Sequence, residues 1–180
     1  MQKFDEIMPK TWLVHLNQIN DYRGKFVKTL SESMLSEIIC NFVMREEYYS
    51  ISNKDVIRGM HFQVPPHDHV KIVYCLKGVV QDVLLDLRPG PTYGNSKSIL
   101  LEESSPMMLI IPSGIAHGFK SLTNGSLMVY KTSTEYEPSH DAGIIWNSFD
   151  FDWKLSNPIL SNRDTLHPKF EDFQTPFSCI

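Results

Sequence analysis

The sequence lacks the features that would place it in a membrane or in an oxidising compartment. No uninterrupted apolar run in its 180 residues approaches the length of a membrane span, and its first residues lack the apolar core of a secretory signal. The three cysteines, Cys40, Cys75 and Cys179, are odd in number and widely spaced, as is typical of buried or incidental thiols in a reducing compartment. We therefore expect a cytoplasmic protein with no membrane partner.

Basic residues are also scarce. Lys and Arg number 17 against 21 Asp and Glu, which gives a net charge of -4 and a pI of about 5.9, and no long basic run is present. Nucleic acid is therefore not expected as a main partner. Internal repeats, linkers and low-complexity segments are absent as well, and a chain of this length suits a single domain, residues 1–180, with a sizeable core.

What the chain does contain is a series of short segments of strand character, separated by turn residues such as Lys77-Gly78, Ser113-Gly114 and Asn124-Gly125. A short helix is expected at 31–37 with Ser31 as its cap, and another at 162–166 with Ser161 as its cap. Strands at this spacing favour an all-β fold, a double-sheet β-barrel of jelly-roll type. The expected strands are 11–20, 38–43, 48–52, 71–76, 79–87, 99–101, 107–111 and 127–131.

Two stretches, 58–66 and 111–119, each place one histidine between apolar residues where a strand meets Gly and Pro. The backbone there can present His61 and His117 to a partly dry cavity. An isolated histidine in such a setting is more often a core residue bonded to a carbonyl. Two of them favour a functional site when further polar residues lie in the neighbouring pattern, and these residues are Arg58, Lys71 and Tyr130.

On these motifs the chain resembles the cupin-fold dTDP-4-dehydrorhamnose 3,5-epimerase family. Its Arg58-Gly59-Met60-His61-Phe62-Gln63 is similar to the family motif Arg-Gly-Leu-His-Tyr/Phe-Gln. The resemblance runs in order and with nearly uniform spacing over about residues 10–170, and implies an all-β, cupin-type double-stranded β-helix with short peripheral helices. Further matching segments are 21–26, 71–73, 77–79, 82–88, 91–94, 111–119, 130–131, 143–146 and 160–164.

The resemblance implies an isomerase that inverts carbons flanking the 4-keto group of a nucleotide-diphosphate sugar. A proton beside a ketone can be removed because the charge spreads onto the carbonyl oxygen, so the site needs a base, a donor at that oxygen and an acid on the opposite face. By resemblance His61 is the base and Asp164 the carboxylate that orients it, while Lys71 is a candidate to stabilise the enolate and Tyr130 a candidate acid. The chemistry requires no metal and no organic cofactor. Apart from the resemblance, these residues would be interpreted as ordinary strand and cap residues.

The resemblance also implies a set of substrate ligands. Arg23 and Arg58 are expected at the diphosphate, which suits a fork of permanently charged donors. In the family the segment that corresponds to Arg23 and Phe26 reaches into the neighbouring subunit's site, which implies a homodimer with strand exchange at the N-terminal region. The remaining ligand candidates are Lys28, Glu46, Ser50, Gln63 and His117.

Two departures from the family pattern bear on the nucleotide. Lys28 stands where the family usually has Glu, and Glu46 and Tyr48 stand where it has Gln and Asn. A carboxylate at Glu46 can accept the paired donors of guanine, and some relatives act on GDP-linked 4-keto heptoses, so GDP is a hypothesis beside dTDP. The alternative is a simple exchange of exposed charges. The choice between a hexose and a heptose, and between C3, C5 or both, stays open.

Two other interpretations remain. One is a metal-dependent cupin, because His67-x-His69 is a two-histidine ligand spacing that His117 can complete, although the Glu expected shortly afterwards is missing. The other is a non-catalytic sugar-nucleotide binding module on the same fold. The presence of a base, an acid and an orienting carboxylate argues for an enzyme, because a binding module has no use for them.

Overall fold

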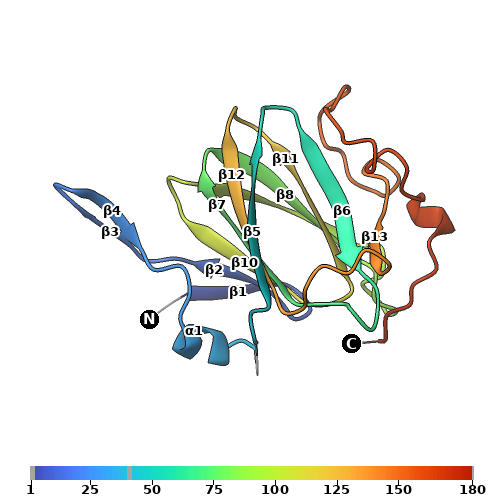
Figure 1. Ribbon diagram of the computed structural model, residues 1–180, viewed down its shortest axis with the longest axis horizontal. Helices are drawn as coiled ribbons and strands as arrows, with labels where there is room; N and C mark the ends of the chain where they lie inside the picture. Colours follow the sequence, from blue (N-terminus) through green and yellow to red (C-terminus); the bar gives the residue numbers. More distant parts are fainter. Residues whose placement is uncertain (1–2, 40–41, 180) are drawn as a thin grey trace.

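Strands account for most of the regular structure. In the computed structural model, which describes residues 3–39 and 42–179, neighbouring strands of every sheet pair antiparallel (Figure 1). The elements in order are β1 (Lys3–Met8), β2 (Thr11–His15), β3 (Gln18–Asp21), β4 (Gly24–Val27), α1 (Glu32–Ser36), β5 (Glu46–Ser52), β6 (Ile57–Gln63), β7 (Lys71–Lys77), β8 (Val79–Asp86), β9 (Ser96–Glu102), β10 (Met107–Ile111), β11 (Ile115–Ser121), β12 (Ser126–Thr132), β13 (Asp141–Gly143) and the 3-10 turn η1 (Phe170–Asp172). No helix in the described part of the chain is long and apolar enough to cross a membrane.

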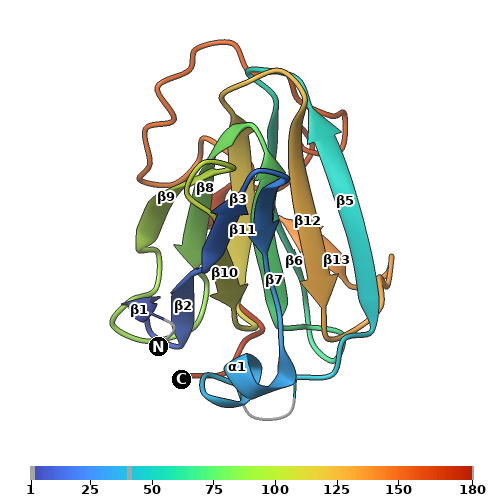
Figure 2. The same ribbon diagram turned by 90° about the vertical axis from the view of Figure 1, so that its left-hand side faces the viewer.

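Two sheets face each other and confirm the predicted double-sheet, all-β fold. The larger sheet has the strand order β1-β2-β10-β7-β12-β5, and the smaller has β13-β6-β11-β8-β9. Figure 2 shows β5 at one edge of the larger sheet and β1 and β2 at the other. The third sheet is the hairpin of β3 and β4, which projects away from the two main sheets (Figure 1).

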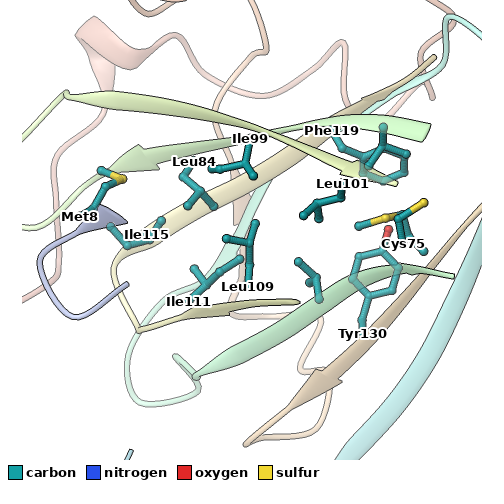
Figure 3. Packing of buried hydrophobic residues seen from close by; sticks show 13 residues of the cluster. Met8, Cys75, Leu84, Ile99, Leu101, Leu109, Ile111, Ile115, Phe119 and Tyr130 are labelled. Carbon is teal, nitrogen blue, oxygen red and sulfur yellow. The ribbon is translucent and has the colours of Figure 1, made fainter. Parts of the chain in front are cut away.

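An apolar layer fills the space between the sheets on the side of β8, β9 and β10. Leu84 and Ile115 from the smaller sheet lie opposite Leu109 and Ile111 from the larger one, and all four are buried (Figure 3). Fully burying a side chain of this size contributes about 1.5–3 kcal/mol. Tyr130 borders this layer where it gives way to polar residues on the side of β5 and β6. The core therefore holds one half of the sandwich together and leaves the other half available for a site.

The outer face of each sheet is covered by a different part of the chain. Met34 and Leu35 of α1 pack on the larger sheet, whereas the segment after β13 packs on the smaller one through Trp153 and Phe177. A parallel bridge between Val56 and Ile159 ties that segment to the start of β6. The C-terminal segment thus runs beside the strand that carries His61.

The strand predictions are largely confirmed, and the differences are local. Segment 11–20 is two strands, β2 and β3, rather than one. The described part of 38–43 forms no strand, and residues 40 and 41, which include Cys40, lie outside the described residues. The Ser31 cap is confirmed, because its hydroxyl accepts the Met34 N–H.

The helix predicted at 162–166 is wrong. Ser161 does accept the Asp164 N–H through its hydroxyl at 3.1 Å, but the residues that follow form turns and no helix. Pro168 disfavours the helical conformation for the residue before it, so any helix here would be short. The hydrogen bond from Asp164 to Ser161 therefore stabilises a turn, and Asp164 lies in that turn.

Candidate active site

The two histidines predicted from sequence lie side by side on the smaller sheet. His61 on β6 and His117 on β11 are direct partners across the strand pair. Close approach of the two strands beside them requires glycine: Gly59 has a φ of +131°, and a Cβ there would lie 2.5 Å from the Gly118 Cα and 2.9 Å from the His117 carbonyl oxygen. The register of β6 and β11 shifts between His117 and Phe119, at the same place. The glycines of both motifs thus set the histidine positions.

His61 forms a dyad with Asp164. Its Nε2 lies 2.6 Å from Asp164 Oδ1, and the Gly59 N–H lies 3.5 Å from Oδ2. The His61 side chain is 25% exposed and the Asp164 side chain 3%. Asp164 comes from a segment more than 100 residues away, which is fastened to β6 by the bond from the Ile57 N–H to the Ile159 carbonyl at 3.1 Å.

Burial and charge set the protonation of this dyad. Burial lowers the pKa of His61 below its ordinary value, against the opposing effect of Asp164. Burial by itself would raise the pKa of Asp164, but contacts with His167 and His61 bring it below its ordinary value. At neutral pH the pair is therefore a neutral imidazole beside a carboxylate. An Nε2–H that donates to Asp164 leaves the Nδ1 lone pair of His61 as the basic position.

His117 forms a second, more deeply buried pair. Its Nε2 lies 2.8 Å from Asp82 Oδ2, and the two side chains are 4% and 0% exposed. Asp82 Oδ1 has no hydrogen-bond partner among the described residues. Complete burial raises the pKa of Asp82 above its ordinary value, although His117 and Lys71 oppose the shift.

The larger sheet contributes a lysine and a tyrosine from the opposite wall. Lys71 on β7 is buried, and burial lowers the pKa of its amine to about 8, against the charges of Asp141 and Asp82. Tyr130 on β12 is also buried, which raises the pKa of its hydroxyl well above the ordinary value. The Tyr130 hydroxyl lies 2.9 Å from the Ser50 Oγ. Lys71 is thus a cation that can lose its charge just above neutral pH, and Tyr130 keeps its proton.

A cavity of about 460 Å³ lies between these two walls. All four predicted catalytic residues line it, together with five of the predicted substrate ligands: Glu46, Ser50, Arg58, Gln63 and His117. Two of the ligands are held by the protein itself. The side-chain amide of Gln63 is hydrogen-bonded to two loops. It donates to the His67 carbonyl at 2.8 Å and accepts the Glu137 N–H at 2.7 Å. Arg58 donates to the Ser52 hydroxyl at 3.0 Å, which aligns its guanidinium along β5.

The other three predicted ligands, Arg23, Phe26 and Lys28, do not line this cavity. They lie on or just after the β3–β4 hairpin that projects from the barrel (Figure 1). Arg23 is paired with Asp21 at 2.6 Å in an exposed contact, and Phe26 is 62% exposed. The expectation that this hairpin serves a neighbouring subunit stays a prediction.

Sequence reasoning gave no role to several cavity residues that the structure brings together. Arg163 Nη2 lies 2.6 Å from Asp141 Oδ2, and the Tyr136 hydroxyl donates to the same oxygen at 3.2 Å. Glu46 accepts the Tyr136 N–H at 2.9 Å. The available signals were the position of Arg163 directly before Asp164, and that of Asp141 shortly before the 143–146 motif. Tyr136 lies in a loop that carried no signal.

The histidines of the metal-cupin interpretation do not gather at one point. The ring of His67 packs at a tilt against the ring of His140, with ring centroids 4.4 Å apart. His69 faces Thr134 through Nδ1 at 3.0 Å, and burial lowers its pKa to about 3. His117 is hydrogen-bonded to the buried carboxylate of Asp82. The three-imidazole set that the sequence left open is therefore not assembled.

Among residues 3–39 and 42–179, one group of potential metal ligands does lie close together. The donors of His61, Asp164 and His167 lie within 4.8 Å of one another. A hydrogen bond accounts for the 2.6 Å contact between His61 and Asp164. We therefore interpret this group as a hydrogen-bonded His61–Asp164 pair with the imidazole of His167 beside it.

Comparisons with known proteins place this geometry in one family. The sequence model described as dTDP-4-dehydrorhamnose 3,5-epimerase matches residues 6–172. The enzyme of that name from Shigella flexneri is 33% identical over 169 residues, which cover 92% of this chain and 93% of the relative. That from Escherichia coli K12 is 37% identical over 151 residues, 80% of each chain.

Solved structures give the same result. The dTDP-4-dehydrorhamnose 3,5-epimerase of Bacillus anthracis with TDP and PPi bound superposes with a TM-score of 0.90 at 28% identity, covering 94% of this chain and 99% of that one. The epimerase of Legionella pneumophila in complex with dTDP-4-keto-L-rhamnose also has a TM-score of 0.90, at 25% identity, covering 97% and 95%. The cupin-type barrel expected from sequence is thus confirmed by its structural neighbours.

Proposed function

This chain belongs to the dTDP-4-dehydrorhamnose 3,5-epimerase family, and from that premise we propose that it inverts the carbons flanking the 4-keto group of a nucleotide-diphosphate sugar. As a member of the family it is an isomerase. The observation that carries the proposal is the cavity itself, which has His61, paired with Asp164, on the side of one sheet and the protonated Tyr130 on the other. Inversion needs a base and an acid on opposite faces of the sugar, and this arrangement supplies them.

His61 is proposed as the base. Asp164 occupies Nε2, so Nδ1 takes the proton from the carbon next to the ketone. The carboxylate then stabilises the imidazolium and holds the ring in one tautomer. A neutral His61 at pH 7 is already in the state that the step requires.

Lys71 is proposed to stabilise the enolate. Its ammonium group is buried in the cavity wall, where a positive charge acts through little water. A donor aimed at a developing oxyanion is worth roughly 10²–10³ in rate. The amine keeps its charge below its pKa of about 8, so the group serves this role at neutral pH.

Tyr130 is proposed as the acid that returns a proton to the opposite face. Its hydroxyl contacts Ser50 at 2.9 Å, and its ring stacks on Tyr48 with centroids 4.7 Å apart. These contacts fix the hydroxyl across the cavity from His61. General acid catalysis of this kind supplies roughly 10²–10⁴ in rate.

The substrate is proposed to be a dTDP-linked 4-keto-6-deoxyhexose, bound by a homodimer without a metal or organic cofactor. Support comes from the relatives, whose names specify dTDP-4-dehydrorhamnose, and from solved neighbours with TDP or dTDP-4-keto-L-rhamnose bound. Arg58 and Arg163 offer guanidinium groups to the diphosphate at the cavity. Arg23 and Phe26, which are exposed on the hairpin, are proposed to complete the partner's site.

The alternative substrate is a GDP-linked 4-keto-heptose, and Glu46 is the residue that supports it. Its Oε2 accepts the Tyr136 N–H, which leaves Oε1 for a nucleobase. Titration calorimetry with dTDP and GDP, on the wild type and on Glu46→Gln, compares the two. If Glu46 accepts from guanine, Glu46→Gln weakens GDP binding by about tenfold, as expected for a charged hydrogen bond, and leaves dTDP unchanged. Tighter dTDP than GDP binding in the wild type would refute the GDP hypothesis.

The proposed reaction is tested by incubation with dTDP-4-keto-6-deoxyglucose in D₂O, with deuterium located by NMR and mass spectrometry. The wild type is expected to incorporate deuterium at C3 and C5 with inversion, and His61→Ala neither to exchange nor to invert. Incorporation at C3 alone would identify a C3-only epimerase.

Tyr130→Phe gives the sharper result in the same assay. It leaves the base in place, so exchange continues on one face while inverted product is lost. Tyr48→Phe, which alters the stacked neighbour of Tyr130, is the matched control and keeps both activities. Equal loss of exchange and inversion in Tyr130→Phe would contradict the assignment of Tyr130 as the opposite-face acid.

A further inference from the structure

A third imidazole lies directly behind the His61–Asp164 dyad. His167 Nε2 is 3.6 Å from Asp164 Oδ1, and its ring meets the ring of His61 edge-on with centroids 5.6 Å apart. The His167 side chain is 11% exposed, and its Nε2 is buried without a hydrogen-bond partner in the described chain. Asp164 Oδ1 is therefore approached by two imidazole nitrogens.

The surrounding strands hold His167 in this place. A Cβ on Gly143 would lie 2.5 Å from His167 Nε2, so the ring fills the space that a side chain on β13 would occupy. Gly143 is itself the strand partner of His61. The next residue is tied down as well, because the Ile145 N–H donates to the Pro168 carbonyl at 2.9 Å. The ring is wedged between β13 and the carboxylate.

Packing does not explain an imidazole here. An apolar ring would fill the same space without burying a nitrogen that lacks a full partner, and such burial costs free energy. His167 is also absent from the cavity lining, so its position does not favour direct contact with a substrate bound there. Its Nε2 approaches the carboxylate of the dyad, at a distance that a small shift on substrate binding turns into a hydrogen bond.

We propose that His167 is a positioning residue of the epimerase reaction, whose Nε2–H holds the Asp164 carboxylate in line with His61 so that Nδ1 of His61 stays directed into the cavity. This inference rests on the proposed function of the dyad. It extends the base assembly from two residues to three, His61, Asp164 and His167.

The proposal predicts a specific kinetic signature. Because His167 does not line the cavity, its loss lowers kcat and leaves KM unchanged. A donor on Asp164 also draws charge away from His61, so without it His61 holds its proton more tightly and the acid limb of activity moves to higher pH. The other charged groups that face His61 are Arg163, from the C-terminal segment, and Lys71 on β7, and neither changes in the variants below.

The experiment compares three variants of the full chain. His167→Phe keeps the ring volume without the donor, and His167→Gln restores an N–H near the Nε2 position. Leu166→Ala, at an 83% exposed neighbour on the same turn, is the control. We expect kcat to fall about tenfold in His167→Phe, less than the roughly 10² that a 1 Å misplacement costs, and to recover in His167→Gln. A His167→Phe enzyme with wild-type kcat, or equal losses in the Phe and Gln variants, overturns the proposal.

An NMR titration of the His61 ring in wild type and His167→Phe provides a readout that does not need turnover. An upward shift of the His61 midpoint in His167→Phe supports the coupling, and identical midpoints contradict it. If wild type fails to turn over any 4-keto sugar nucleotide, the proposed function fails by itself, and the titration still decides whether His167 acts on the dyad.

Discussion

The molecule contains two His–Asp pairs side by side, and they differ in what surrounds them. His61 and His117 are strand partners, and each faces a carboxylate through Nε2, at 2.6 and 2.8 Å. Yet His61 is 25% exposed toward the cavity, whereas His117 is 4% exposed. By residue type and distance alone the pairs would be interchangeable.

The carboxylates explain why they are not interchangeable. Asp164 receives contacts from His61, His167 and the Gly59 N–H, which keep its pKa low and its charge in place. Asp82 is completely buried, one of its oxygens has no hydrogen-bond partner among the residues that the structure describes, and burial raises its pKa. The comparison teaches that donors around a buried carboxylate, rather than its histidine, decide whether it carries the charge that a base dyad needs.

The largest expected difference between the pairs is in turnover. Asp164→Asn keeps the shape of the dyad but removes the charge that stabilises the imidazolium, so kcat is expected to fall about 10³–10⁴-fold. Asp82→Asn, the matched change in the second pair, is expected to lower kcat by about tenfold or less. Steady-state kinetics with the 4-keto substrate measures both, and comparable losses would mean that the His117 pair carries the chemistry as well.

The second expected difference is in stability. The folded pKa of Asp164 is depressed, so its ionised form contributes stability above its unfolded pKa near 3.8 and loses it as the pH falls through the folded value. Asp164→Asn should lower the free energy of unfolding at pH 7 by about 1–3 kcal/mol. The folded pKa of Asp82 is raised, so its ionised form costs stability above the unfolded value, and Asp82→Asn should change the free energy by less than about 1 kcal/mol.

Urea denaturation at pH 7 and near pH 3 separates the two carboxylates. The deficit of Asp164→Asn should shrink at the lower pH, because the unfolded wild-type chain binds a proton at this carboxylate there while the folded chain keeps it ionised. A deficit that stays constant with pH would show that Asp164 contributes through its shape and contacts rather than through its charge.

The two pairs also differ in how much of each could be predicted from the sequence. Strand alternation and Gly and Pro turns were enough to predict the double-sheet barrel, and the motif around His61 marked that histidine as a site candidate, because both depend on local pattern. Asp164 required the family resemblance, since nothing local connects it to a histidine more than 100 residues earlier. His167 and Asp82 were given no role, because their importance lies in burial and in donors that only the folded chain brings together.

The smallest expected effect is on the pH profile of activity. Asp164 is expected to affect its acid limb and Asp82 its alkaline limb. The proposed mechanism requires neutral His61, whose pKa is below its ordinary value of 6.5, and charged Lys71, whose pKa is about 8, so kcat/KM should have an acid limb below pH 6.5 and an alkaline limb near pH 8. Asp164 raises the pKa of His61, so Asp164→Asn should move the acid limb to lower pH and leave the alkaline limb in place. Asp82 raises the pKa of Lys71, so Asp82→Asn should move the alkaline limb to lower pH and leave the acid limb in place. A profile of kcat/KM from pH 5 to 10 for the three enzymes measures both limbs, and a shift of the same limb in both variants would show that the two pairs titrate as one unit.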